Sequence, residues 1–310
     1  MKMISEFNDL DRIEGQFIVG SVTRGVNTKN NTPYLSIELR DASGAIAAKK
    51  WESTVQDEEI FVPGNVVLVT GETNRYKDSL QLKVVSASLV PLEEIAVEKF
   101  VKAPPIAKEE LVNKFNKYVA SIKNEDCQKL LNYMITKYGD KIFSYPAAVS
   151  IHHEYSSGLL MHSLTMADIA SFLIPIYEAN YDLLITGCLL HDLGKIIELE
   201  GPIVYHYSTE GKLLGHISIM CAEIRKAAEE LKITSEVPLL LEHMVLSHHG
   251  QQEFGSPIMP LTKEALLLSL IDNLDSKMVV INKAIADVEP GNFSTKVFPL
   301  DNRSFYKPKN

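Results

Sequence analysis

The first third of the chain alternates apolar and polar residues in short runs. Five runs with this period of two predict strands at 16–24, 33–40, 45–51, 65–72 and 79–86. A polar segment at 27–31 and the Asp-Ala-Ser-Gly sequence at 41–44 are typical of turns between strands. Five short strands joined in this way predict an all-β barrel of the OB-fold type.

Beyond Val90 the apolar residues recur at helical spacing instead. Expected helices span 108–122, 125–138, 158–177, 181–197, 212–231, 237–249 and 262–286. The predicted fold class is therefore multidomain, with an N-terminal all-β OB-fold barrel followed by an all-α domain. We place the barrel at 1–92, a linker at 93–107, the helical domain at 108–287 and an irregular tail at 288–310. With 310 residues, the chain is long enough for two cores.

Composition narrows the class of protein. A content of 45% hydrophobic and 23% charged residues is ordinary for a globular protein. The cysteines, Cys127, Cys188 and Cys221, are too dispersed for a disulfide framework, so a reducing, cytoplasmic location is expected. The chain shows no signal peptide and no uninterrupted apolar run of membrane-spanning length, so no membrane partner is expected. A net charge of -9 argues against a uniformly basic face but leaves room for a local basic groove.

Histidines concentrate in one part of the chain: all nine lie between His152 and His249. Within this part, His191 and Asp192 end the apolar run 183–190. A carboxylate in such a run needs a partner, and a divalent cation is a natural one. A buried His-Asp pair that caps the helix is the alternative for these two residues.

Two further residues repeat this pattern. His162 lies early in an apolar helix, and Asp272 lies inside the apolar run 266–272. Together with His191 and Asp192 they would supply two imidazoles and two carboxylates to one ion. Such ligands favour Mn²⁺, with Fe²⁺, Mg²⁺ or Co²⁺ as alternatives.

Three more histidines stand at predicted helix ends. His216 follows a glycine at a helix start, and His248 and His249 precede Gly250 at a helix end. With Asp192 bridging, they would hold a second metal about 3.5 to 4 Å from the first. The alternative is that they bind substrate phosphate around a single metal.

Two other residues have candidate roles beside these ligands. Lys195, one turn after His191, can direct its ammonium at phosphate oxygens in the transition state. Asp275, one turn after Asp272, can orient a metal ligand.

The first four ligand candidates match the H...HD...D pattern of the HD phosphohydrolase superfamily. The three added histidines are similar to those of its binuclear branches, including the HD-GYP phosphodiesterases. In that branch a glutamate four residues before the first histidine also binds metal. Gly158 occupies this position here, which argues against a third metal.

Over nearly its whole length the chain resembles the YhaM-type 3′-to-5′ exoribonucleases. The resemblance rests on the predicted barrel followed by Ile-His-His-Glu at 151–154, the 158–162 segment, Leu-Leu-His-Asp-Leu-Gly-Lys at 189–195 and Leu-Ser-His-His-Gly at 246–250. It implies that His152 and His153 face substrate phosphate, although a helix-entry turn explains them equally well.

The function that we expect is metal-dependent 3′-to-5′ exonuclease activity on single-stranded RNA, with release of nucleoside monophosphates. Single-stranded DNA is left open as a second substrate. Strand aromatics are often barrel core, but exposed ones can stack on bases, so substrate-binding candidates are Arg24, Tyr34, Arg75 and Tyr76. Two alternatives remain: hydrolysis of a dNTP, cyclic dinucleotide or alarmone, and non-catalytic single-strand binding. Assembly into a homo-oligomer is left open.

Overall fold

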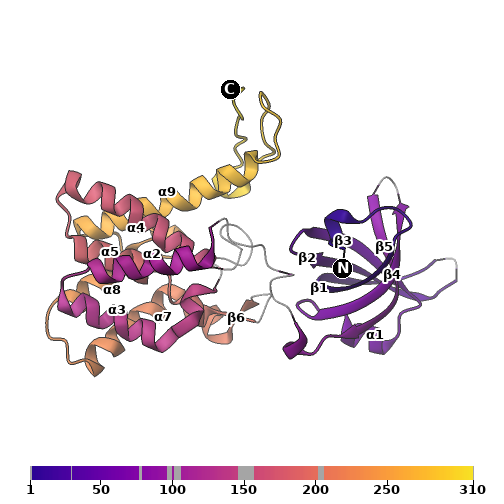
Figure 1. The fold of residues 1–310 in the computed structure, drawn as a ribbon, viewed down its shortest axis with the longest axis horizontal. Helices are drawn as coiled ribbons and strands as arrows, with labels where there is room; N and C mark the ends of the chain where they lie inside the picture. The colour runs from indigo at the N-terminus through magenta and orange to yellow at the C-terminus, as the bar shows by residue number, and fades with distance from the viewer. Residues whose placement is uncertain are drawn as a thin grey trace. The chain divides into compact units, whose positions relative to one another are not determined.

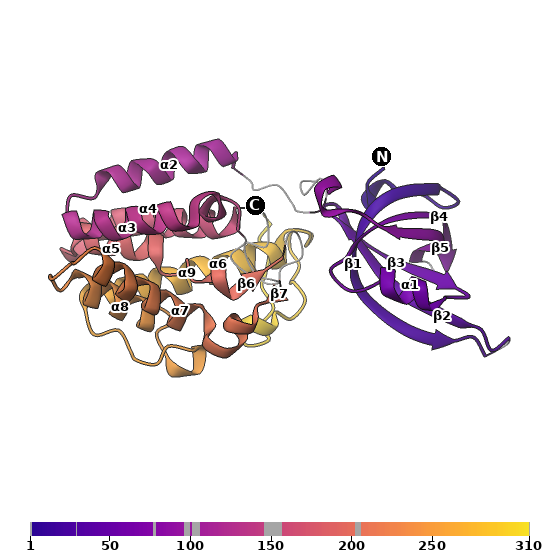
Figure 2. The same cartoon turned by 90° about the horizontal axis from the view of Figure 1, so that it is seen from below.

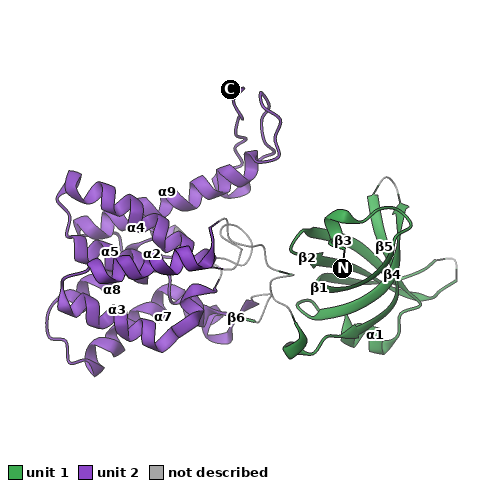
Figure 3. Ribbon diagram, in the orientation of Figure 1, with its two compact units in different colours: residues 1–103, 201–205 green, residues 104–200, 206–310 purple. Residues whose placement is uncertain are grey.

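The structure of the chain is a computed structural model that describes residues 2–28, 30–76, 79–95, 100, 106–145, 157–201 and 206–309. It divides into two compact units (Figure 3). The first unit holds residues 1–103 and 201–205, and the second holds residues 104–200 and 206–310. The barrel strands lie in the first unit and the long helices in the second, as Figures 1 and 2 show. The predicted boundaries at 92 and 107 stay predictions.

Five strands close the barrel of the first unit. They are β1 (Arg12–Val26), β2 (Pro33–Asp41), β3 (Gly44–Trp51), β4 (Val66–Tyr76) and β5 (Ser79–Leu89), in the order β1-β2-β3-β5-β4. The β3–β5 pair is parallel, and the other recorded pairs are antiparallel. All five predicted strands and the predicted fold class are confirmed. Each strand is longer than its apolar pattern, because the ladder hydrogen bonds continue past the buried positions.

Alternate residues of the strands fill the barrel interior. Val19, Leu35 and Leu82 are fully buried there, and Phe17 lies with them. A short helix that the apolar pattern did not predict, α1 (Val55–Ile60), follows β3. Its signal is a capping box, in which Thr54 and Asp57 exchange hydrogen bonds between side chain and backbone.

The second unit is built from helices. They are α2 (Lys108–Ser121), α3 (Glu125–Tyr138), α4 (Gly158–Tyr177), α5 (Tyr181–Leu190), α6 (Lys195–Glu198), α7 (Thr209–Glu230), α8 (Val237–Ser247) and α9 (Lys263–Ile285). A two-stranded ladder of β6 (Leu199–Glu200) and β7 (His206–Tyr207) lies between α6 and α7 in the chain. Helices α4, α5, α8 and α9 pack on one another and form the core that carries the candidate ligands.

The prediction of one helix over 181–197 is wrong. Helix α5 ends at Leu190, and residues 191–194 form a turn before α6. This turn presses against α7, because a β-carbon on Gly194 would lie 2.2 Å from the carbonyl oxygen of His216. Helix α7 is itself broken at Gly215, whose φ of 71° is in the left-handed region that favours glycine. The close approach places two predicted ligand segments side by side.

Among the described residues, α4 is the one helix long and apolar enough to cross a membrane by length and composition. It carries Asp168, so it is not an uninterrupted apolar run. A core helix of a soluble protein meets the same criteria, and 44% of the most apolar window of α4 is buried in the protein. This helix is therefore weak support for a membrane span.

After α9 the chain folds back on itself as a hairpin-like segment over 291–307. The backbone amides of Gly291 and Val297 donate to the carbonyls of Lys307 and Arg303 at 2.7 and 2.9 Å. A short 3₁₀ helix, Phe298–Leu300, forms its tip, and Leu300 is only 3% exposed. The tip is thus anchored to the helical unit.

Candidate metal centre

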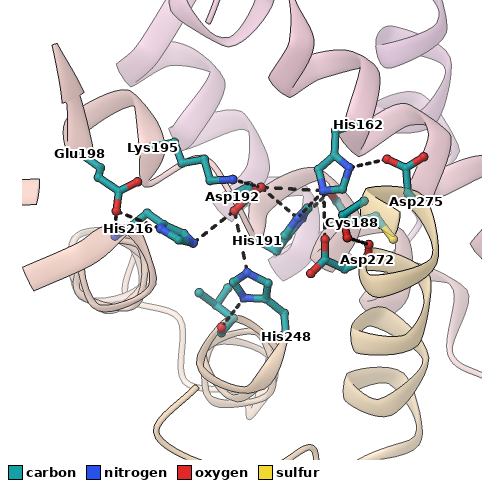
Figure 4. A network of polar contacts seen from close by, with 12 residues as sticks. His162, Cys188, His191, Asp192, Lys195, Glu198, His216, His248, Asp272 and Asp275 are labelled. Atoms are coloured by element: carbon teal, nitrogen blue, oxygen red, sulfur yellow. Dashed lines mark hydrogen bonds and ion pairs between the residues drawn. The ribbon is translucent and has the colours of Figure 1, made fainter. Parts of the chain in front are cut away.

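The predicted ligands come together from five separate segments of the helical unit (Figure 4). Helix α4 provides His162, the turn after α5 provides His191 and Asp192, and α7 provides His216. The end of α8 provides His248 and His249, and α9 provides Asp272. Two groups have ligand atoms within 4.8 Å of one another: His162 with His191 and Asp192, and His216 with His248 and His249.

The carboxylate of Asp192 lies between these two groups. Its Oδ2 is 3.4 Å from Nε2 of His191 and 3.8 Å from Nε2 of His162. Its Oδ1 is 3.4 Å from Nε2 of His216 and 3.8 Å from Nε2 of His248. Each oxygen of Asp192 therefore faces two imidazole nitrogens.

The four imidazoles that face Asp192 are each oriented by an oxygen at Nδ1. The partners are Asp275 Oδ2 for His162 at 2.6 Å, Glu198 Oε1 for His216 at 3.1 Å, the Cys188 carbonyl for His191 at 3.0 Å and the Val245 carbonyl for His248 at 2.7 Å. A carbonyl or ionised carboxylate oxygen can only accept, so Nδ1 carries the hydrogen, and the Nε2 lone pair is left for the centre whenever the imidazole is neutral. Such outer contacts fix the tautomer of metal-binding histidines.

Two carboxylates orient histidines of the centre, and the sequence predicted only one of them. Asp275 was expected to orient a ligand, and its contact with His162 confirms that position. Glu198 was missed, although it is a buried carboxylate after the apolar pair 196–197, the same signal that marks Asp192. It accepts hydrogen bonds from both the backbone and the ring of His216.

Three buried atoms at the centre have no hydrogen-bond partner among the described residues: Asp192 Oδ1, His216 Nε2 and His248 Nε2. All three are acceptors, given the tautomers above, and they face one another. Buried acceptors without a donor are unfavourable unless a cation satisfies them. The residues therefore fit a divalent cation held by nitrogen and oxygen ligands without thiolate.

The charges around the centre favour the protonation states in which Asp192 and His248 can bind a metal ion. Burial alone would raise the pKa of Asp192, but Lys195 and His191 hold it well below its usual range. Burial and the neighbouring His191 and His249 keep the pKa of His248 well below its usual value, so this imidazole is neutral at pH 7. Both residues are ready to bind metal without losing a proton.

His162 behaves differently. Burial lowers its pKa, but its hydrogen bonds with Asp272 and Asp275 outweigh burial and raise the pKa to about 10. The Nε2 atom of His162 lies 3.2 Å from Oδ1 of Asp272. A metal ion would therefore compete with a proton for His162 at neutral pH.

Lys195 reaches the centre from the first turn of α6. Its ammonium nitrogen lies 2.7 Å from Asp192 Oδ2, and burial, which lowers its pKa, is outweighed by Asp192, which raises it. The residue is thus a partly buried cation beside the Asp192 carboxylate. Its predicted contact with substrate phosphate stays a prediction.

Of the predicted substrate-binding residues, Tyr34 lies in an aromatic pair on the barrel. It stands opposite Trp51 on β3, with ring centroids 4.9 Å apart, and the Lys49 ammonium lies 4.9 and 5.0 Å from the two rings. A β-carbon on Gly25 would lie 2.3 Å from the Tyr34 ring, so glycine there lets the ring lie on β1. Trp51 is 37% exposed. Tyr34, Trp51 and Lys49 thus form one cluster of two aromatic rings and a cation on the barrel.

The other substrate-binding candidates lie elsewhere or outside the described residues. Arg24 forms an ion pair with Glu58. Arg75 and the exposed Tyr76 lie at the end of β4. The predicted His152 and His153 lie outside the described residues.

Each of the two units matches a known protein family. Residues 159–277 match the HD domain family, and residues 17–90 match an OB-fold nucleic acid binding domain. The chain is therefore an HD-domain protein with an OB-fold domain in front of it.

Relatives of similar length narrow this class. The 3′-5′ exoribonuclease YhaM of Geobacillus sp. (strain WCH70) is 43% identical over 300 residues, which are 96% of this chain and 92% of that protein. The protein of the same name from Oceanobacillus iheyensis is 44% identical over 96% of this chain and 94% of its own. This chain belongs to the family of YhaM 3′-5′ exoribonucleases. The second OB-fold domain of Methanococcus maripaludis replication protein A is 20% identical, covers 29% of this chain and 93% of its own, and has a TM-score of 0.24, too low to support a conclusion.

Proposed function

We propose that this chain hydrolyses single-stranded RNA from its 3′ end and releases nucleoside monophosphates. The observation that carries the proposal is the Asp192 carboxylate, whose two oxygens each face two imidazole nitrogens in a buried centre. A shared carboxylate between two metal positions is suited to phosphoryl transfer. Membership of the YhaM family and the OB-fold domain support RNA as the substrate.

The metal ligands are assigned from the two groups around Asp192. We assign His162, His191, Asp192 and Asp272 to a first ion, and His216, His248 and His249 with the shared Asp192 to a second. Mn²⁺ is the ion that we propose. Divalent cations in such a site activate water and stabilise charge on the phosphate oxygens.

Protein side chains supply the remaining parts of the reaction. The partly buried ammonium of Lys195, which contacts Asp192, stabilises negative charge that develops on the scissile phosphate. Asp275 and Glu198 keep the Nε2 atoms of His162 and His216 directed inward. On the barrel, Tyr34 and Trp51 stack on bases, and Lys49 adds positive charge near the backbone.

The test is a 5′-labelled single-stranded RNA incubated with the full chain and Mn²⁺. We expect a descending ladder of shortened RNA that EDTA abolishes and that Asp192→Ala reduces below detection. The matched control is Asp287→Ala, which removes an exposed carboxylate just after α9 and should leave the ladder unchanged.

Other outcomes would replace the proposal. Intact RNA together with turnover of a dNTP, a cyclic dinucleotide or an alarmone would make the chain a small-nucleotide hydrolase. Binding of RNA without hydrolysis of any of these substrates would make it a single-strand binding protein.

A further inference from the structure

A pocket opens directly beside the candidate metal centre. His248, His249 and Asp272 line it, and its volume is about 330 Å³. This volume lies at the lower end of the range of small-molecule sites, roughly 300 to 1,000 Å³, so the pocket accommodates a nucleotide but not a longer strand. The residues assigned to the metal ions therefore form part of its lining.

Two elements form the other walls of this pocket. Helix α9 adds Lys277, an exposed lysine for which the described residues provide no ion pair. The C-terminal hairpin adds Leu300 and Asp301 from its tip. Leu300 is buried and fixes the tip, whereas the Asp301 side chain is 87% exposed.

The Asp301 carboxylate is available to a ligand. Its backbone is in the left-handed region at φ 56°, a conformation that Asp tolerates better than most residues. Its one recorded ion pair, with Arg303 at 3.3 Å, is solvent-exposed and therefore easily exchanged for another contact. A carboxylate can accept hydrogen bonds from two adjacent hydroxyl groups at once.

We infer that this pocket binds the 3′-terminal nucleotide of RNA, with Asp301 accepting hydrogen bonds from the 2′- and 3′-hydroxyls of its ribose and Lys277 facing a phosphate. The inference rests on the proposed function. An exonuclease that releases monophosphates must place one nucleoside beyond the phosphate at the metal. A pocket that starts at the metal ligands and holds about one nucleotide provides the space for that nucleoside.

The inference also gives the C-terminal hairpin a role in substrate choice. Only RNA ends carry both hydroxyls, and the 2′-hydroxyl is the group by which proteins distinguish RNA from DNA. Asp301 would therefore make the enzyme prefer a ribose over a deoxyribose at the last nucleotide. The same contact would require a free 3′-hydroxyl.

The test compares two RNA oligonucleotides that differ only in the last sugar, ribose or 2′-deoxyribose. We measure the single-turnover rate of removal of the last nucleotide by the full chain in Mn²⁺. A hydrogen bond to a charged group predicts that wild type prefers the ribose end about tenfold or more. Asp301→Gly removes the carboxylate without backbone strain, and we expect it to lower this preference to about twofold or less.

Control variants separate the carboxylate from the fold. Glu289→Ala removes an exposed carboxylate that does not line the pocket, and it should keep the wild-type preference. Asp301→Asn keeps the shape and tolerates the backbone conformation, and it should lose most of the preference with an unchanged melting temperature. Lys277→Ala should slow both substrates by a similar factor.

Calorimetric titration with adenosine 5′-monophosphate and its 2′-deoxy form, in Mn²⁺, distinguishes failure of the pocket from failure of the proposed function. If the wild type prefers the ribose form and Asp301→Gly does not, but no RNA is shortened, the pocket is correct and the exonuclease proposal is wrong. If RNA is shortened and folded Asp301→Gly keeps the full preference for ribose, the inference is wrong. Equal treatment of both sugars by the wild type also overturns it.

Discussion

Asp275 is the residue through which the importance of ligand orientation can be measured most directly. Its Oδ2 accepts a hydrogen bond from Nδ1 of His162 at 2.6 Å, and both side chains are buried. Asp275→Asn keeps the size of the side chain but removes the negative charge that strengthens this hydrogen bond. The imidazole of His162 is then held less firmly, and its Nε2 is a weaker base toward metal.

Loss of such an outer contact typically costs about 10- to 100-fold in metal affinity or activity. For Asp275→Asn we expect the lower end, about tenfold, since an amide oxygen can still accept from Nδ1. This corresponds to about 1.4 kcal/mol of metal-binding free energy. Asp275→Ala leaves the buried Nδ1 hydrogen without this acceptor, and we expect the full hundredfold.

The assay is the initial rate of shortening of a 5′-labelled RNA as a function of Mn²⁺ concentration, together with calorimetric Mn²⁺ binding. The midpoint should rise about tenfold in Asp275→Asn, and saturating Mn²⁺ should restore most of the rate. Asp287→Asn is the matched control and should keep the wild-type midpoint. An unchanged midpoint in Asp275→Asn would refute the reasoning, and so would a lost rate at unchanged Mn²⁺ binding.

Three further outcomes are expected. Gly194→Ala forces the turn after α5 away from α7, because the new β-carbon would lie 2.2 Å from the His216 carbonyl oxygen. The free energy of unfolding should fall by about 1 to 3 kcal/mol, seen as a lower melting temperature, and the Mn²⁺ midpoint should rise. Two unchanged values would contradict the close approach. Trp51→Ala removes half of the stacking pair with Tyr34 and should weaken single-stranded RNA binding about 5- to 150-fold in a fluorescence anisotropy titration, while the Mn²⁺ midpoint stays constant. In the metal-free protein the pKa of His162 is raised from 6.5 to about 10. Its protonated form therefore adds stability that is complete below pH 6.5 and is lost as the pH rises through about 10. The increase in melting temperature on adding Mn²⁺ should grow across this interval, and a constant increase would argue against protonation of His162.

Local patterns in the sequence carried much of the fold. The five strands follow from apolar residues with a period of two, and the long helices follow from a period near 3.6. The helix over 181–197 was wrongly extended because 191–197 continues the apolar pattern of 183–190. In the structure α5 stops at Leu190, and Gly194 in the turn that follows approaches α7 closely. Local apolar spacing contains no information about that contact.

The chemistry of the centre was readable for a related reason. A carboxylate or imidazole in an apolar run is costly unless it has a partner, so Asp192, Asp272 and His162 stood out as residues with a special role. Glu198 carries the same signal in a shorter apolar run, and Asp275 could be suspected only from its position one turn after Asp272. Their contacts with His216 and His162 depend on how α6, α7, α4 and α9 pack.

By itself, the sequence determined which residue types were available, which elements would carry them and that a divalent cation would suit them. The tertiary structure decided that the two oxygens of Asp192 each face two imidazoles, and that the tip around Leu300 closes a pocket next to them. The physical reason is the distance along the chain over which each feature is determined. Helix and strand periods arise from contacts a few residues apart, whereas a ligand set and a pocket require atoms from segments more than a hundred residues apart to meet within a few ångströms.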